Sequence, residues 1–373
     1  MSQPVTTATA RGADAERERL ALLSPTVVIG AGLVGASIGC ALSAAGVPVH
    51  LRDRYRSHAL VAAGLGAGSV EAPDPAEVTL VVVAVPPDAV PEVVTRALAR
   101  YRHAVVTDVA SVKLPVVEAL RARGTELDRY VGSHPMAGSQ YSGPLTASGK
   151  LFVDRGWVIA DGTGSPESVR RVEALVAVCG GRLIHLAPAD HDRAVAEISH
   201  VPQIMSSLTA ARLREVPAGD LLLAGQGVRD VTRVAGSDPK LWSQIITANH
   251  QQILAQLRLV REDLDRLLAG IDADDPAVIG SLIAAGRQGV EALPGKHGQR
   301  RAVLDTVVVE IPDAPGALAR LFADIQAQGV NIEDLSIEHD QAKQAGYLSV
   351  AVGAGRAEDL RRAMLRSGWE LRS

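Results

Sequence analysis

Six residues near the start of the chain, Gly30-Ala31-Gly32-Leu33-Val34-Gly35, fit the pattern G-x-G-x-x-G and constrain the fold more than any other feature. The apolar run TVVIG leads into them and predicts a strand, and the run ASIGCALSAAG follows them and predicts a helix that ends at Gly46. Gly30 permits a tight turn, Gly32 lets the backbone approach a pyrophosphate, and Gly35 allows close packing of helix and strand. The motif in this context predicts a Rossmann-type dinucleotide-binding fold, with Leu33 and Val34 also at the cofactor.

A carboxylate at the end of the second predicted strand favours NAD as the dinucleotide. Asp53 ends the run VPVHLRD about 20 residues after the glycines, where it can accept a hydrogen bond from the adenosine ribose. The same carboxylate would repel the 2′-phosphate of NADP, although Arg52 or Arg54 beside it can instead turn toward a phosphate. We also assign Val85 and Pro86, which end the next strand, to the cofactor site.

Further apolar runs extend the predicted sheet. VTLVVVAVPP, HAVVTDVA and YVGSHP are nearly continuous in apolar character, which is typical of parallel strands covered by helices on both faces. Helical runs alternate with them, including DAVPEVVTRALARY with Asp88 as its expected N-cap. GWVIADG predicts one more strand, and we place the end of the α/β domain near residue 187.

Composition excludes several classes of function. The chain has 373 residues, which predicts two or three domains, and its formal net charge of -4 gives nucleic acid or anionic lipid no electrostatic reason to bind. Its two cysteines, Cys40 and Cys179, lie in apolar stretches, so neither a disulfide framework nor a thiolate metal site is expected. No signal peptide or membrane span is predicted, which favours a cytoplasmic protein whose residues 1–24 form a disordered tail.

The segment 188–293 is predicted to be all helical. One long helix is expected to start at Ser237-Asp238-Pro239 and to run for about 30 residues, with an apolar stripe at Ile253, Leu257, Val260, Leu264 and Leu267. The stripe serves either as the core of its own domain or as the interface of a homodimer with interlocked helices.

The remainder of the chain predicts a separate module. The segment 294–302 is rich in Gly and basic residues and resembles a linker. From residue 303 to 373 the runs read as strand, helix, strand, strand, helix, strand, which makes a complete ferredoxin-like βαββαβ unit.

One histidine stands out as a candidate catalytic base. His134, in the run GSHPMAG, ends a predicted sheet strand, and open α/β sheets hold their ligands at that edge. A neutral imidazole there can take the proton of a substrate hydroxyl while the carbon gives a hydride to nicotinamide. Ser111, in DVASVK at the end of the preceding strand, is placed to orient the ring.

At these residues the sequence resembles the prephenate/arogenate dehydrogenases of tyrosine biosynthesis over roughly residues 25–300. The resemblance rests on motifs that occur in order: the glycine fingerprint, DVASVK, GSHPMAGS, EISHVPQ and RDVTRVAGSDPKLW. It implies NAD-dependent oxidative decarboxylation of prephenate, with arogenate as the alternative substrate. His134 matches the family's catalytic histidine, Ser111 its hydrogen-bond partner, and Arg233 the arginine that holds the ring carboxylate.

Other positions follow from the same resemblance. Ser199 and His200 belong to a motif that in many relatives reads S-H-x-P-H, and Gln203 replaces its last histidine here, which leaves recognition of the substrate side chain open. Ser139 and Gln140 follow the catalytic motif, and relatives can carry an acidic residue at the position of Gln140. Taken alone, Arg233 is equally consistent with a salt bridge beside a helix.

The segment from Val303 resembles an ACT domain, a small-molecule-sensing module. We expect Gly316 and Asn331 near an aromatic amino-acid effector, tyrosine above all, while a purely structural dimerisation module is the alternative. Two rival functions remain: a β-hydroxyacid dehydrogenase with a lysine base, and an NAD- and amino-acid-sensing regulator. No helical lysine motif competes with His134, and 38 basic against 42 acidic residues argue against a DNA-binding regulator.

Overall fold

The computed structural model describes residues 6–138, 143–293, 304–312, 314–340 and 345–372, and side chains within them except at 6–13, 338–340 and 345. The chain divides into two compact units, Met1–Glu262 and Asp263–Ser373.

A seven-stranded sheet organises the first unit, in the order β2-β1-β3-β4-β5-β6-β7. Its first five strands are parallel, β6 runs antiparallel to β5, and β7 is parallel to β6. The parallel part confirms the Rossmann-like sheet expected from the apolar runs. The strands are β1 (Thr26–Ile29), β2 (Val49–Arg52), β3 (Leu80–Val83), β4 (Val105–Asp108), β5 (Tyr130–Pro135), β6 (Gly156–Ala160) and β7 (Arg182–Leu186).

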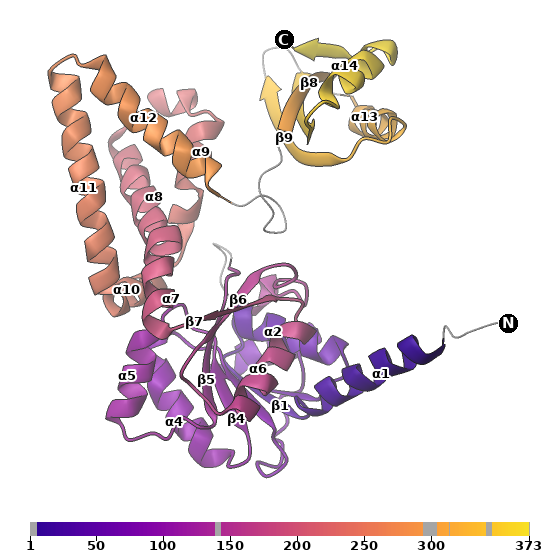
Figure 1. Cartoon of the computed structure of the whole chain (residues 1–373), viewed down its shortest axis with the longest axis vertical. Helices are drawn as coiled ribbons and strands as arrows, with labels where there is room; N and C mark the ends of the chain where they lie inside the picture. The colour runs from indigo at the N-terminus through magenta and orange to yellow at the C-terminus, as the bar shows by residue number, and fades with distance from the viewer. Residues whose placement is uncertain (1–5, 139–142, 294–303, 313, 341–344, 373) are drawn as a thin grey trace. The chain divides into compact units, whose positions relative to one another are not determined.

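Helices cover both faces of this sheet (Figure 1). On one face, α2 (Leu33–Ala44), α3 (Arg56–Gly64) and α6 (Pro166–Val178) share a core with strand residues such as Val28 and Val82. On the other face, α4 (Val90–Arg100) and α5 (Leu114–Ala122) pack on Val81 and Val106. Alternate residues of β3 therefore enter opposite cores, which explains why all four of its residues are apolar and buried.

Three local expectations were wrong. The segment from residue 6 to 21 is not disordered but forms helix α1 (Thr6–Ala21), and Leu23 just after it is fully buried in the sheet core. Strand β7 was not anticipated, because its residues are mostly exposed at the sheet edge and lack a buried apolar run. Asp88 does not cap α4: it lies inside the 3₁₀ turn η1 (Pro87–Ala89), and the N-cap position is Ala89, because the chain already turns helically before the main helix starts.

A helical region follows β7, as expected. In order it contains α7 (Pro188–Val195), the π-helical turn η3 (Ala196–His200), α8 (Val201–Arg212), the short turns η4 (Leu213–Glu215) and η5 (Asp220–Leu223), α9 (Gln226–Thr232), the turn η6 (Arg233–Gly236), α10 (Pro239–Ala248), α11 (His250–Asp272) and α12 (Pro276–Glu291).

The helix expected to run unbroken from Pro239 is divided at Asn249 into α10 and α11. Its predicted start is confirmed, since the Asp238 carboxylate accepts a hydrogen bond from Lys240 N. Of the apolar stripe, Ile253 is buried and packs with Leu257 and Val260 against η3 and α8. This part of the stripe is intramolecular core.

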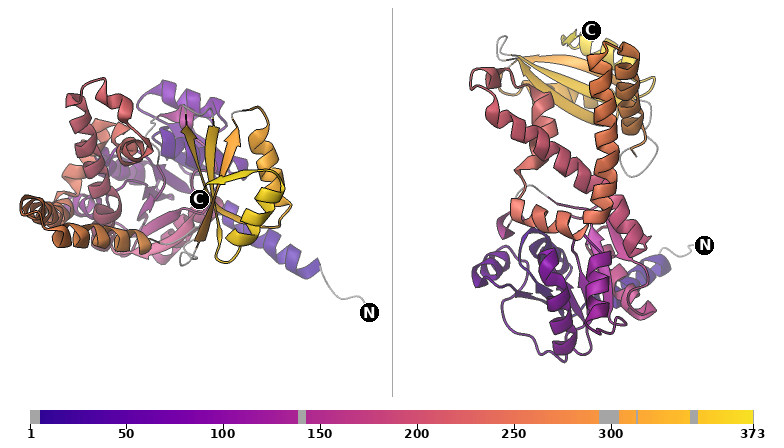
Figure 2. Two further views of the ribbon diagram at one scale, coloured as in Figure 1. Left: turned by 90° about the horizontal axis from the view of Figure 1, so that it is seen from above. Right: turned by 90° about the vertical axis from the view of Figure 1, so that its left-hand side faces the viewer.

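The second unit contains a four-stranded antiparallel sheet in the order β11-β8-β10-β9. Helices α13 and α14 lie on one face of it (Figure 2), where their apolar side chains and those of β8 and β10 form a separate core. This is the βαββαβ topology expected from the sequence. Its elements are β8 (Leu304–Pro312), α13 (Ala317–Gln326), β9 (Ile332–Asp340), β10 (Ala345–Gly353), α14 (Ala357–Arg366) and β11 (Glu370–Arg372). Among the described residues of the chain, no helix is both long and apolar enough to span a bilayer.

Candidate active site

The glycine turn between β1 and α2 fits a dinucleotide phosphate. Gly30 has φ +102°, and a Cβ there would lie 2.1 Å from a backbone oxygen just after β3. A Cβ at Gly35 would lie 1.9 Å from the carbonyl oxygen of Gly30, so larger residues would separate helix from strand. Gly32 is the N-cap of α2, and a Cβ there would meet no atom within 4 Å. The space before the helix N-terminus is therefore open to a phosphate, beside the first helical residues, Leu33 and Val34.

Asp53 lies directly after β2 and beside the glycine turn. Its Oδ2 accepts a hydrogen bond from Ala31 N at 2.7 Å, and its Oδ1 accepts one from Tyr55 N at 2.7 Å. These two bonds fix the carboxylate at the carboxyl edge of the sheet. Val85 and Pro86 follow β3, the strand next to β1, at the same edge.

The two arginines beside Asp53 differ in their surroundings. The guanidinium of Arg52 donates to three backbone carbonyls, including that of Val70 at 2.8 Å, and is thereby held against the sheet. The guanidinium of Arg54 lies over the ring of Tyr55, 4.7 Å from its centroid, and donates to the Tyr55 hydroxyl. Arg54 is therefore the better placed of the two to meet a phosphate.

His134 lies near the end of β5 and is half-buried. Its Nδ1 lies 2.9 Å from Nε2 of the buried His191 on α7, and the two rings meet edge to face. In the described structure the ring partner of His134 is thus His191, not the expected Ser111, which lies half-buried in the segment between β4 and α5. Burial and the neighbouring His191, Lys113 and His200 hold the pKa of His134 well below its ordinary value.

A buried charge cluster supports the strand that carries His134. The ammonium of Lys113 donates to the carboxylate of Asp108 and, at 2.7 Å, to the carbonyl oxygen of Ser133. The hydroxyl of Tyr130 donates to the other Asp108 oxygen at 2.7 Å. All four of these residues are buried, so Lys113 couples the ends of β4 and β5 through a compensated ion pair.

The predicted substrate residues lie on the helices after β7. His200 is buried, and its Nδ1 lies 3.1 Å from Nδ2 of Asn249, while its ring meets Trp242 edge to face. Burial, opposed by Asp192, lowers the pKa of His200 to about 4. Ser199 is half-buried beside it in η3. Gln203, one turn along in α8, is buried and donates from Nε2 to the Val234 carbonyl at 2.9 Å.

Arg233 begins the turn η6 directly before Val234, and its side chain is exposed in the isolated chain. The Gln203–Val234 hydrogen bond therefore ties the segment that carries Arg233 to α8. Ser139 and Gln140 lie outside the described residues. In the second unit, Gly316 is the N-cap of α13 with φ +85°, and the exposed Asn331 donates to Glu333 at 2.7 Å.

Sequence reasoning missed the partners of these residues. His191, Asp192, Lys113 and Asn249 converge on His134 and His200 from three segments of the chain. The only local signal for the first two was a His-Asp pair on a predicted helix, which is equally common on helix surfaces. Among the described residues, no group of three or more His, Cys, Asp or Glu side chains is arranged to hold a metal ion.

Comparison with known proteins agrees with this geometry. The family model described as "Prephenate dehydrogenase, nucleotide-binding domain" matches residues 38–185, and "Prephenate dehydrogenase, dimerization domain" matches residues 187–280. A probable prephenate dehydrogenase of Streptomyces niveus is 34% identical over 359 residues, which cover 93% of this chain and 99% of that protein.

Solved structures show the same fold. The arogenate dehydrogenase of Synechocystis is 27% identical, with a TM-score of 0.59 over 71% of this chain and 98% of that one. The prephenate dehydrogenase of Aquifex aeolicus, solved with hydroxyphenyl propionate and NAD+, is 22% identical, with a TM-score of 0.63 over 72% of this chain and 98% of that one. From the near full-length similarity to the Streptomyces protein and the two family models, the chain belongs to the prephenate dehydrogenase family.

Proposed function

We propose that the protein is an NAD-dependent prephenate dehydrogenase, which converts prephenate to 4-hydroxyphenylpyruvate and CO2 in tyrosine biosynthesis. The observation that carries the proposal is the position of His134 at the end of β5, at the same sheet edge as the glycine turn after β1. The strands β1, β3, β4 and β5 are parallel neighbours, so their carboxyl ends share that edge. Open α/β sheets bind ligands there.

The residues around the glycine turn suit NAD. The N-terminus of α2 and the unobstructed Gly32 would hold the pyrophosphate, and Asp53 would accept a hydrogen bond from the adenosine ribose. Bound NAD supplies the hydride acceptor of the oxidation. A nucleotide-binding family model over residues 38–185 and the NAD+ complex of the Aquifex relative support this assignment.

His134 is proposed to act as the general base. Its lowered pKa keeps the ring neutral at physiological pH, as a base requires. The imidazole of His134 takes the proton of the substrate hydroxyl while the substrate carbon that bears this hydroxyl loses its hydride. The resulting ketone allows the ring carboxylate of the substrate to leave as CO2. Loss of CO2 makes the ring aromatic, which drives the reaction forward. Ser111, which follows the neighbouring strand β4, remains a second proposed catalytic residue.

The substrate carboxylate and side chain are proposed to contact the helical region. Arg233 suits the ring carboxylate, because a guanidinium can bind it through two parallel hydrogen bonds. Ser199, His200, Gln203 and the undescribed Ser139 and Gln140 are proposed to surround the side chain. The dimerization-domain model over residues 187–280 favours a homodimer through this region.

One contact favours the keto acid prephenate over the amino acid arogenate, and a second keeps arogenate as the alternative. The Asn249 amide can only donate to Nδ1 of His200, so the hydrogen of His200 is on Nε2, which is then a donor. A donor suits a keto acid, whereas the ammonium of arogenate needs an acceptor. The Gln203 amide NH2 is engaged with Val234, which leaves its carbonyl oxygen as an acceptor and keeps arogenate as the alternative substrate.

A spectrophotometric NADH assay with both substrates tests the proposal. We expect prephenate to give the higher kcat/KM, and His134→Asn to lower kcat by about 10²–10⁴-fold with little change in KM. His103→Asn, which changes an exposed histidine of the same unit, is the matched control and should leave kcat unchanged. Failure of wild-type protein to reduce NAD with either compound would refute the proposed reaction.

We further propose that residues 303–373 form an ACT regulatory domain, joined by the linker 294–302. The support is its βαββαβ topology with the sheet order β11-β8-β10-β9 and its own core. Gly316 and Asn331 flank α13 near its two ends and are the proposed contacts of an aromatic amino acid such as tyrosine.

A further inference from the structure

His134 is the first member of a hydrogen-bonded chain that ends on a buried carboxylate. Nδ1 of His134 lies 2.9 Å from Nε2 of His191, and Nδ1 of His191 lies 2.7 Å from Oδ1 of Asp192. His191 and Asp192 are both buried, at 0% and 2% exposure. They lie in adjacent positions of α7, and His134 comes from β5.

The backbone fixes Asp192 as an acceptor. Its Oδ1 accepts a hydrogen bond from Lys113 N at 2.8 Å, and its Oδ2 accepts one from Leu114 N at 2.9 Å. Both N–H groups belong to the start of α5, where the helix dipole also favours a negative charge. The carboxyl group of Asp192 therefore cannot move without breaking these bonds.

This carboxylate determines where the hydrogens lie on both rings. Because Asp192 can only accept, His191 carries its hydrogen on Nδ1 and, as a neutral ring, offers a bare Nε2. That bare nitrogen accepts, so His134 must donate from Nδ1. Nε2 of His134 is then the unprotonated atom of the ring, and it is the atom free to take a proton from a substrate.

We propose that His191 and Asp192 are positioning residues that impose the Nδ1–H tautomer on His134, so that its Nε2 serves as the base. The inference rests on the proposed function of His134. The proton that leaves the substrate hydroxyl ends on Nε2 of His134, and the Nδ1 hydrogen stays in the bond to His191. Asp192 stabilises the resulting positive charge through the His191 ring.

The other charged groups near His134 do not supply this stabilisation. Lys113, before α5, disfavours a second positive charge, and so does His200 of η3 when protonated. Asp108, at the end of β4, is already engaged by the Lys113 ammonium and the Tyr130 hydroxyl. Asp192 is therefore the carboxylate whose charge reaches His134 through a hydrogen-bonded ring.

Asp192→Asn tests the inference with little change of shape. An Asn side chain removes the carboxylate charge in either orientation of its amide. With its oxygen toward Leu114 N, its NH2 faces Nδ1 of His191 and reverses both tautomers, which places the His134 hydrogen on Nε2; with its oxygen toward Lys113 N and His191, the tautomers stay but the imidazolium of His134 loses its counter-charge. We expect kcat to fall at least tenfold, and by about 10²–10⁴-fold where the tautomers reverse, with KM for prephenate changed less than threefold. The acid limb of the kcat profile should also move to lower pH, because the imidazolium loses its carboxylate.

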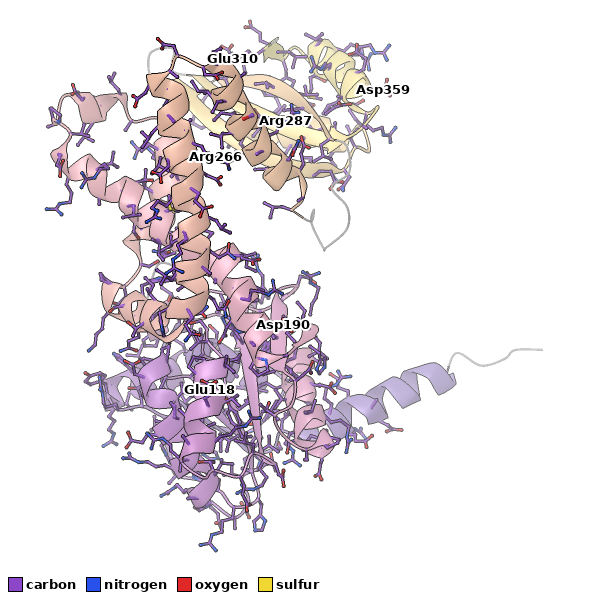
Figure 3. The ribbon with its side chains drawn as sticks, turned by 60° about the vertical axis from the view of Figure 1, so that its left-hand side comes forward. Glu118, Asp190, Arg266, Arg287, Glu310 and Asp359 are labelled. Carbon is purple, nitrogen blue, oxygen red and sulfur yellow. The ribbon has the colours of Figure 1, made fainter. Side chains whose placement is uncertain are left out.

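Asp190→Asn is the matched control on the same helix. Asp190 is exposed (Figure 3), and its carboxylate lies 3.6 Å from the guanidinium of Arg193. This variant should keep wild-type kcat and the wild-type pH profile. If Asp192→Asn fails to fold, His191→Gln removes the ring between His134 and Asp192 while it leaves the bonds of Asp192 to α5 in place, and kcat should fall at least tenfold.

A readout without turnover separates this inference from the proposed function. Long-range ¹⁵N–¹H spectra of histidine-labelled wild-type protein should show His134 protonated on Nδ1, and His134→Asn identifies its signals. A neutral His134 protonated on Nε2 would overturn the inference even in an active enzyme, as would a folded Asp192→Asn with unchanged kcat and pH profile. Wild-type protein that shows the expected tautomer but oxidises neither substrate would refute the proposed function alone.

Discussion

Asn249 donates a hydrogen bond from its side-chain amide to the backbone carbonyl of Asp192 at 2.7 Å, across 57 residues of sequence. The same Nδ2 lies 3.1 Å from Nδ1 of His200. Asn249 stands where α10 ends and α11 begins, and it is buried. The interruption between these helices thus joins α7 and η3, the two segments that carry His191 and His200.

Asn249→Ala should therefore destabilise the protein and impair the site together. It leaves Nδ1 of His200 without a donor, at a cost of about 1–3 kcal/mol, and takes one of two donors from the Asp192 carbonyl, which still accepts from Ala196 N, so we expect a loss of about 1–3 kcal/mol in the free energy of unfolding. Urea unfolding and the kcat/KM for prephenate measure the two effects. Gln251→Ala, two residues on and exposed, is the control. Equal stability of the two variants would contradict this role of Asn249.

The sequence predicts the fold well where a single local pattern determines a helix or a strand. The parallel strands are short apolar runs, and Asp238-Pro239 correctly marks a helix start. The division of the predicted long helix at Asn249 could not be predicted in this way. Nothing in the run from Pro239 marks the end of a helix there, because the hydrogen bonds that stabilise the interruption go to Asp192 and His200, which are far away in the sequence. Helix α1 was missed for the opposite reason, since its run is polar and carries no apolar period.

The residues of the candidate site also divide into those that a local sequence motif identifies and those that only the folded chain brings together. The glycine turn and His134 are recognisable because each depends on residues adjacent in the chain. His191 is 57 residues from His134, and only the folding of α7 against the ends of β4 and β5 brings the rings together. A His-Asp pair on a helix carries no sign of such a partner, so no reading of local pattern identifies it.

His200 should make the protein less stable in acid. Its pKa is about 4 in the folded chain and about 6.5 when unfolded, so the unfolded chain binds the proton more tightly. Stability should be full above about pH 6.5 and fall as the pH drops toward 4, by up to about 3 kcal/mol. Urea unfolding at neutral and acid pH measures this. His200→Gln should show a smaller loss than wild type, whereas the exposed His250→Gln should match it; a full loss in His200→Gln would exclude His200 as the cause.

Arg233→Ala should mainly weaken substrate binding. A carboxylate that loses a charged partner costs about 2–3 kcal/mol, which corresponds to a rise in KM for prephenate of roughly 30–150-fold. Steady-state kinetics measure this, with Arg229→Ala on α9 as an exposed arginine control. An unchanged KM would return Arg233 to a structural role beside the helix.

Asp53 should make NAD the preferred cofactor. Its carboxylate is fixed beside the glycine turn, where we propose that the ribose binds, and the guanidinium of Arg52 is engaged by backbone carbonyls. We expect a higher kcat/KM with NAD than with NADP, and Asp53→Ala should reduce that ratio by about tenfold or more. Glu118→Ala removes an exposed carboxylate from α5 (Figure 3) and should leave the ratio unchanged. A wild-type preference for NADP would indicate that Arg54 binds the phosphate.

Tyrosine should change the activity of the full chain through the second unit. The βαββαβ module has its own core and contains none of the residues proposed for catalysis, so an effector can bind it without competing for the active site. We expect tyrosine to alter kcat/KM for prephenate and to raise Tm, because a ligand that binds only the folded state stabilises it. Asn331→Ala should weaken both responses, since it removes a polar side chain beside α13, whereas the exposed Gln328→Ala should preserve them. A purely structural dimerisation module predicts a different result: tyrosine would move neither the rate nor Tm in any of the three proteins. Competition with prephenate would instead raise KM equally in wild type and Asn331→Ala, and would place tyrosine in the active site rather than in the module.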